Sequence, residues 1–170
     1  MALLDIVTYP DNFLKKPTEP VANIDGKIQE VIDNMAETMY HAPGVGLAAI
    51  QVGIGKSLLI YDVSPPDGER SLSVLINPKI VSSEGTQLSE NEGCLSVPEY
   101  RSDVKRALSV LVEAYDRNEK LVRIEAHDFM AIVLQHEIDH LNGTLFIDRI
   151  SSLKRQLYAR RIKKQLKQNG

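Results

Sequence analysis

Three stretches of the chain repeat apolar residues at the spacing of an amphipathic helix. The first covers residues 25–41, where Asp25 can cap the N-terminus and a proline-glycine pair follows the end. The second covers residues 129–141. The third begins near residue 152, and four apolar residues share one stripe of it: Leu153, Leu157, Ile162 and Leu166. We therefore predict an N-terminal, a central and a C-terminal helix.

Strand patterns occur in two pairs between the first two helices. Residues 56–63 and 72–81 are rich in Leu, Ile and Val, and the sequence Ser-Pro-Pro-Asp-Gly between them is typical of a turn. Residues 108–115 and 120–126 flank a second polar turn. Each pair predicts a hairpin of two antiparallel strands.

Two glycine-containing segments lie outside these elements. Residues 44–51 predict a loop that enters a buried strand, because two glycines precede a run of small apolar residues. Residues 92–96 predict an irregular loop between the two hairpins. Since strands come in runs apart from the helices, we expect an α+β fold, with antiparallel sheets packed around the helix at 129–141.

Length and composition are typical of one globular domain. The chain has 170 residues, of which 43% are hydrophobic and 25% are charged. We expect residues 1–150 and the helix at 151–170 to form a single domain. No segment approaches the ~20 apolar residues that cross a bilayer, so we expect a cytoplasmic protein without membrane contact.

The net charge of -3 conceals an asymmetry. The first 150 residues carry 13 basic and 23 acidic side chains, whereas residues 151–170 carry no acidic side chain. Seven basic residues lie in this tail: Lys154, Arg155, Arg160, Arg161, Lys163, Lys164 and Lys167. A basic tail is typical either of a ribosomal or nucleic-acid contact or of a solvated helix face, and composition alone favours the solvated face.

The central helix carries the clearest chemical pattern. Residues four apart lie on the same helix face, so His136 and His140 can bind one metal ion. Glu137 lies beside them and can accept a proton from a water molecule at the ion, the arrangement of a metal-dependent hydrolase. The alternative is two surface histidines on an ordinary helix.

A catalytic metal site requires a third protein ligand. No glutamate or histidine follows the motif in the chain, which excludes the usual metallopeptidase completions. His41 and His127 are more typical of surface histidines. Cys94 is the better candidate, because Gly93 lets the backbone approach an ion and a thiolate is a strong ligand, although a free cysteine is often a small buried hydrophobe.

Three separated motifs resemble those of the peptide deformylase family. Residues 44–51 read GVGLAAIQ, residues 92–96 read EGCLS, and residues 135–141 read QHEIDHL. The order matches, and the resemblance spans nearly the whole chain. It implies that residues 1–150 form a catalytic unit that hydrolyses the N-formyl group of formylmethionyl peptides and nascent chains and releases formate.

The resemblance also implies a metal site with Cys94, His136 and His140 as ligands. Ligand identity does not choose among late divalent ions. For bacterial members the resemblance implies ferrous iron as the native ion, with zinc or nickel possible in the purified protein.

The same resemblance implies the catalytic roles. Glu137 would be the general base and acid, while Gln51 and the backbone N–H of Leu95 would donate to the developing oxyanion. Selectivity for methionine requires an apolar pocket, and Ile132 and Val133 share the helix face of His136, as ordinary core residues also would. By family position, the further substrate-binding candidates are Val45, Gly46, Phe129 and Arg101, of which Arg101 could equally be solvated.

Two residues of the central helix invite alternatives. Family members commonly have Gly at the position of Asp128, and we expect Asp128 to cap the helix and change the local geometry. Asp139 is expected either to hold a ligand imidazole or to face solvent.

The resemblance raises the ribosome as a partner of the helix at 151–170, with no DNA contact expected. Two other functions remain open from the residues: a zinc metallopeptidase or amidase, and a non-catalytic metal-binding, ribosome-associated module. The missing downstream ligand argues against the peptidase, and the complete catalytic set argues against the module.

Overall fold

The computed structural model describes residues 2–169 and contains three α-helices and seven strands within them. The helices are α1 (Gly26–His41), α2 (Asp128–Leu141) and α3 (Ser152–Asn169). The strands are β1 (Gly46–Ala48), β2 (Leu58–Tyr61), β3 (Ser73–Glu84), β4 (Gln87–Cys94), β5 (Val97–Arg106), β6 (Ser109–Tyr115) and β7 (Leu121–His127). The three predicted helices and both predicted hairpins are confirmed.

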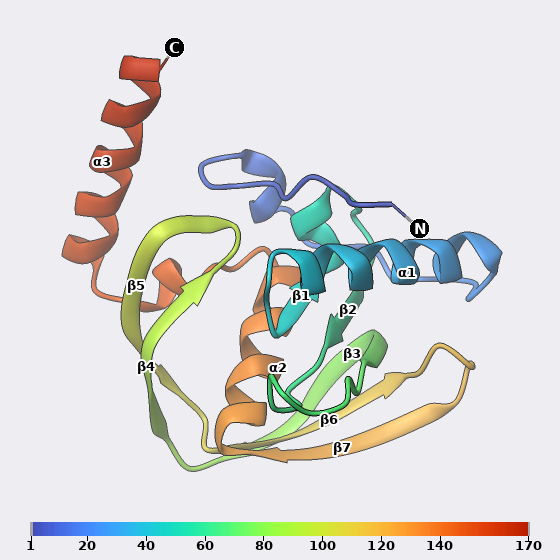
Figure 1. The fold of residues 1–170 in the computed structure, drawn as a ribbon. Coiled ribbons are helices and arrows are strands. Elements are labelled where there is room, and N and C mark those ends of the chain that lie inside the picture. The colour runs from blue at the N-terminus through green and yellow to red at the C-terminus, as the bar shows by residue number, and fades with distance from the viewer. Residues whose placement is uncertain (1, 170) are drawn as a thin grey trace.

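The strands form two antiparallel sheets with α2 between them (Figure 1). The larger sheet has the order β1-β2-β3-β6-β7, and the smaller one pairs β4 with β5. Helix α2 contacts β1, β2, β6 and β7 on one side and β4 on the other. The predicted α+β fold, with antiparallel sheets around the central helix, is therefore confirmed.

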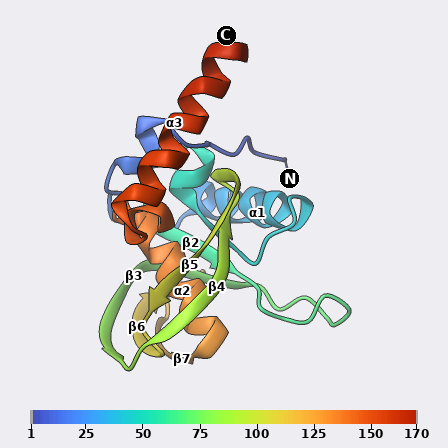
Figure 2. The same ribbon diagram turned by 90° about the vertical axis from the view of Figure 1, so that its left-hand side faces the viewer.

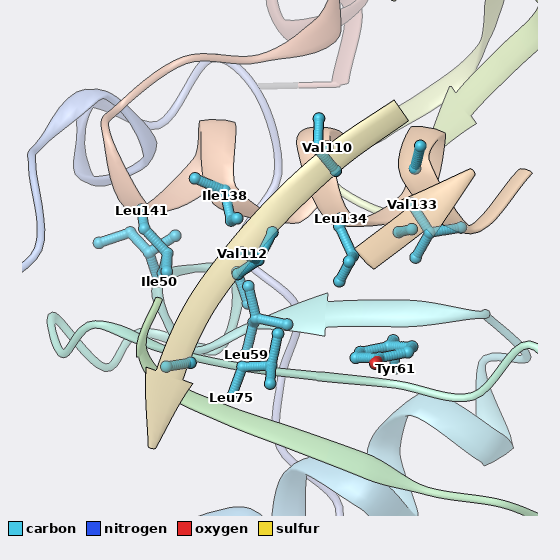
Figure 3. Close-up of a cluster of buried hydrophobic side chains, with 14 residues drawn as sticks. Ile50, Leu59, Tyr61, Leu75, Val110, Val112, Val133, Leu134, Ile138 and Leu141 are labelled. Carbon is cyan, nitrogen blue, oxygen red and sulfur yellow. The ribbon is translucent and has the colours of Figure 1, made fainter. Parts of the chain in front are cut away.

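Apolar side chains fix α2 against the larger sheet. Leu134, Ile138 and Leu141 point toward Leu59 and Val112 of the sheet, and all of them are buried (Figure 3). Full burial of one such side chain contributes roughly 1.5–3 kcal/mol. Because 134, 138 and 141 follow helical spacing, this stripe sets the rotation of α2 and leaves its other face for the smaller sheet.

The segment at 92–96 differs from its prediction as an irregular loop. Strand β4 runs to Cys94, β5 begins at Val97, and Cys94 pairs with Val97 across a tight turn. The sequence of β4 is mostly polar, so it has no apolar alternation to indicate a strand. It is a strand because β5 pairs with it along its length.

The start of α2 also differs from expectation. Asp128 does not cap the helix; His127 occupies the capping position without a side-chain hydrogen bond. Asp128 has a φ of 53°, in the left-handed region that glycine adopts at little cost. This conformation explains why a glycine suits this position.

The C-terminal helix does not bury the face that its apolar residues predicted. Of the four stripe residues only Ile162 is buried, and Tyr158 is its buried neighbour one turn away. Leu153, Leu157 and Leu166 are 66%, 54% and 54% exposed. Helix α3 projects from the body toward the C-terminus (Figures 1 and 2).

The positive φ of Asp128 can be tested by measuring the free energy of unfolding of variants. We expect Asp128→Gly to be about 1 kcal/mol more stable than Asp128→Ala, because alanine is penalised at positive φ and glycine is not. At Lys164, an exposed position within α3, the order should reverse by about 1 kcal/mol in favour of alanine. Denaturant unfolding of the four variants measures both differences, and the same order at both positions would contradict the assigned backbone conformation.

Candidate metal centre and active site

Three ligand atoms converge where α2 meets the end of β4. His136 and His140 lie one turn apart, and their Nε2 atoms are 3.3 Å from each other. The Sγ of Cys94 lies 3.3 Å from the Nε2 of His140. All three donor atoms lie within 4.8 Å of one another, so the structure brings together the residues that the sequence singled out.

This donor set fits a divalent ion. Two nitrogen ligands at the distances of a tetrahedral zinc site lie about 3.3 Å apart, and a nitrogen and a sulfur lie about 3.5 Å apart. The observed separations come close to both values. The Nδ1 of His136 is already hydrogen-bonded to Glu92, at 2.6 Å, which leaves its Nε2 directed at the shared position. The three side chains therefore suit an ion with three protein ligands, to which they would bind as a thiolate and two neutral imidazoles.

Glu137 lies beside the ligands and is buried. Its Oε1 is 4.0 Å from the Nε2 of His136, and its Oε2 has no hydrogen-bond partner among the described residues. Burial, the main cause, raises the pKa of Glu137 to about 7. A carboxylate with a free oxygen and a pKa near neutrality is suited to accept a proton and to return it.

The backbone of Gly46 lies directly against the side chain of Glu137. A Cβ at this position would lie 2.9 Å from both the Cγ and the Oε1 of Glu137, closer than real contacts allow. Gly46 belongs to β1, whose short pairing with β2 fixes the backbone at this distance. The second glycine of the motif at 44–51 is thus required by close approach to the carboxylate.

The side chain of Gln51 lies next to Cys94. Its Oε1 accepts from the backbone N–H of Ala48 at 2.9 Å, which fixes the orientation of the amide. Its Nε2 donates to the Oγ of Ser96 at 3.1 Å and to the Sγ of Cys94 at 3.5 Å. The amide N–H group therefore lies next to the three converging donor atoms. Leu95 follows Cys94 in the turn, and the role of its backbone N–H stays a prediction.

A pocket of about 920 Å³ opens onto this centre. Every predicted substrate-binding residue lines it: Val45, Gly46, Arg101, Phe129, Ile132 and Val133. Val133 also packs in the core against the larger sheet, so it serves as both wall and core. Arg101 is held by its Nη1, which donates to the carbonyl of Asn91 at 3.1 Å, rather than being fully solvated. His41 and His127 are exposed and do not line the pocket.

A buried ionic cluster behind the ligands was missed by the sequence reasoning. Arg106 donates to Glu92 through its Nε, at 3.2 Å, and through its Nη2, and it donates to Asp139 at 2.7 Å. Burial opposes the charge of Glu92, but hydrogen bonds from His136 and Arg106 hold the pKa of Glu92 at about 2. The sequence signal for Arg106 was its place among the alternating residues of β5, where a charge falls on the buried side.

Asp139 fits neither of its two expectations. It is buried, so it does not face solvent, and its oxygens accept from Arg106 and Arg149 rather than from a ligand imidazole. The Nδ1 of His140 has no partner among the described residues. Asp139 precedes His140 in the chain, but successive residues of an α-helix are rotated by about 100° around its axis. The two side chains therefore point to different sides of α2.

Comparison with known proteins identifies the family of this chain. The family model for polypeptide deformylase matches residues 3–156. The chain belongs to the polypeptide deformylase family. A peptide deformylase from Desulfosudis oleivorans is 58% identical over 168 residues, covering 99% of this chain and 97% of its own. One from Thermodesulfovibrio yellowstonii is 53% identical over 163 residues, with 96% and 98% covered.

Solved structures of deformylases share the fold. The peptide deformylase of Legionella pneumophila superposes with a TM-score of 0.89 at 42% identity, covering 98% of this chain and 97% of that one. That of Ehrlichia chaffeensis in complex with actinonin has a TM-score of 0.90 at 39% identity, covering 97% and 98%. The predicted family and its activity, removal of the N-formyl group by a metal-dependent hydrolase, are confirmed. Within residues 2–169, no helix combines the length and apolarity that crossing a bilayer requires.

The contact between Gly46 and Glu137 predicts a loss of turnover. We expect Gly46→Ala to lower kcat about 100-fold, because the added methyl group displaces the carboxylate and a shift of about 1 Å can have this effect. Hydrolysis of a formyl-Met peptide measures the loss. Gly26→Ala is the control, since a Cβ there meets nothing within 4 Å and its kcat should stay unchanged. Equal rates for the two variants would contradict the assigned contact.

Proposed function

We propose that Cys94, His136 and His140 hold one divalent ion and that Glu137 moves the proton during hydrolysis of the formyl group. The observation that carries this proposal is the convergence of the three donor atoms beside a buried carboxylate at the floor of the pocket. A bound ion supplies Lewis-acid activation of water and of the formyl carbonyl. The ligand set leaves the ion open, and we propose Fe²⁺ as the native one, with Zn²⁺ or Ni²⁺ able to replace it.

Glu137 performs the proton transfers in this proposal. Its free Oε2 accepts a proton from the attacking water and then returns it to the departing amine, so that formate and a free N-terminus are produced. A pKa of about 7 lets the same group act in both directions near neutral pH. The other two carboxylates of α2 do not compete for this role, because Asp139 is bonded to two arginines and Asp128 does not line the pocket.

Gln51 and Leu95 stabilise the oxyanion in this proposal. The Gln51 amide is held by Ala48 and directs its N–H group at the ligand cluster, so it requires little reorganisation as charge develops. The backbone N–H of Leu95 is the second donor, placed by the tight turn after Cys94.

The pocket walls select the substrate. Ile132, Val133 and Phe129 form an apolar wall for the methionine side chain, next to the ligand histidines. The backbone of Gly46, at the edge of the larger sheet, pairs with the backbone of the substrate. Val45 and Arg101 then flank the following residues of the peptide.

Residues 1–150 form the catalytic part in this proposal, and α3 is a ribosome-contacting helix of the same domain. Support comes from the face of α3 that the body leaves exposed. Leu153 and Leu157 lie there next to Arg160, Lys164 and Lys167. The basic side chains of this face suit the phosphates of a ribosomal surface, and its leucines suit apolar patches between them. Action on nascent chains at bacterial ribosomes places the protein in the cytoplasm.

The central test separates catalysis from metal binding. Anaerobic protein reconstituted with Fe²⁺ or Zn²⁺ should release formate from a formyl-Met peptide and should leave acetyl-Met peptides and internal peptide bonds intact. Glu137→Gln should lower kcat at least about 1,000-fold with the metal content unchanged, whereas Cys94→Ala should lose the metal. Cleavage of internal bonds would indicate a peptidase, and full activity of Glu137→Gln would overturn its role.

The ribosome contact has its own test. We expect the triple charge reversal of Arg160, Lys164 and Lys167 to glutamate to weaken ribosome binding at least about 10-fold at moderate salt. Hydrolysis of a short formyl-Met peptide should be unchanged. The matched control reverses three exposed lysines elsewhere: Lys27, Lys79 and Lys120. Co-sedimentation with ribosomes measures the binding. An equal loss of co-sedimentation in both variants would show that the attraction depends on net charge alone and would contradict the assignment of the contact to α3.

A further inference from the structure

An unbroken line of charged contacts connects His136 to the protein surface. Glu92 bonds the Nδ1 of His136 at 2.6 Å, and Arg106 bonds both Glu92 and Asp139. Arg149 closes the line with a bidentate pair on Asp139, with its Nε 2.5 Å from Oδ2 and its Nη2 2.7 Å from Oδ1. Basic and acidic side chains thus alternate along one network of five residues: His136, Glu92, Arg106, Asp139 and Arg149.

Exposure distinguishes Arg149 from the rest of this network. Its side chain is 46% exposed, compared with 2% for Arg106 and 12% for Asp139. Truncation of Arg149 therefore leaves little unfilled space in the core. Its chief effect is on charge and geometry, since two carboxylates would then share the single guanidinium of Arg106.

The short helix η3 (Phe146–Arg149) places Arg149 at this position. At its other end, Phe146 stacks on the ring of His136 with the ring centroids 6.2 Å apart. The turn of η3 is fixed by Asp148, whose Oδ2 accepts from the backbone N–H of Leu145 at 2.9 Å. One short helix therefore stacks Phe146 on the imidazole of His136 and, through Arg149, binds Asp139 at the other end of the network.

We infer that Arg149 is a positioning residue for the metal centre: by holding both oxygens of Asp139 it keeps Arg106 on Glu92, and Glu92 then fixes the ring of His136. Without Arg149, Asp139 competes with Glu92 for Arg106. Glu92 is then free to rotate, and the orientation of the His136 ring is less defined. The inference rests on the proposed role of His136 as a ligand.

The test follows metal release and ligand geometry rather than turnover alone. Protein loaded with Co²⁺ is mixed with excess chelator, and the visible absorption of the ion is recorded before and during release. We expect Arg149→Ala to release the ion about 3- to 10-fold faster than wild type and to shift the cobalt bands, below the 10- to 100-fold effects of groups that bond a ligand directly. Arg149→Lys should restore part of the effect.

The control is Arg123→Ala, which removes an exposed arginine from β7. Its release rate and spectrum should match wild type. An Arg149→Ala protein whose release rate and bands equal those of the control, or whose release is slower than wild type, overturns the inference. Loss of thermal stability without either change would show that Arg149 acts on the fold alone, which also overturns it.

A double-mutant cycle tests the route through Asp139. In an Asp139→Asn background, Arg149→Ala should change the release rate less than twofold, because the charged partner is already absent. Equal effects in both backgrounds would overturn the route. Two other results would refute the proposed ligands themselves, whatever Arg149 does. One is a wild-type protein that does not bind one Co²⁺ per chain, and the other is a His136→Ala variant whose cobalt spectrum is unchanged.

Discussion

The burial of α2 between two sheets is the constraint on which the rest of the structure depends. Four of its residues that carry polar or ionisable groups are 8% exposed or less: His136, Glu137, Asp139 and His140. Burying such groups is costly unless each has a partner of matching charge or hydrogen-bonding capacity. The apolar stripe through Leu134 and Ile138 stabilises the helix against the larger sheet, and the surroundings of the other face must satisfy the polar groups.

The hairpin of β4 and β5 supplies most of these partners. Glu92 and Cys94 of β4 both reach α2: Glu92 is bonded to His136, and the Sγ of Cys94 lies 3.3 Å from the Nε2 of His140. Arg106 on β5 joins Glu92 to Asp139, and together with Arg149 it balances the charge of the two carboxylates. Strand β4 is polar and only Ser89 and Glu92 of it are buried. Its register shifts on both sides of Glu92, and Glu92 and Cys94 contact different residues of α2, His136 and His140.

Glu137 differs from Asp139 in that one of its carboxylate oxygens lacks a partner among the described residues. It is buried as deeply as its neighbours, yet one oxygen has no hydrogen-bond partner within residues 2–169, and burial raises its pKa. The close backbone of Gly46 limits the positions that the side chain can take. A group that is desolvated, confined and unpaired is ready to exchange a proton with a bound substrate or water, at a cost that the packing of α2 offsets elsewhere.

The sequence by itself determined the elements and chemistry that depend on neighbouring residues: the three helices, two hairpins, the pairing of His136 with His140 on one helix face, and three motifs that together indicate the family. Tertiary structure alone decided contacts between distant segments. The partners of Asp139 come from β5 and η3, and β4 is a strand because β5 pairs with it. Helix α3 buries Tyr158 rather than Leu157 because Tyr9 and Tyr100, from two remote segments, form the surface it meets. Periodicity records which residues share a face, but the face that is buried depends on what the rest of the chain places against it.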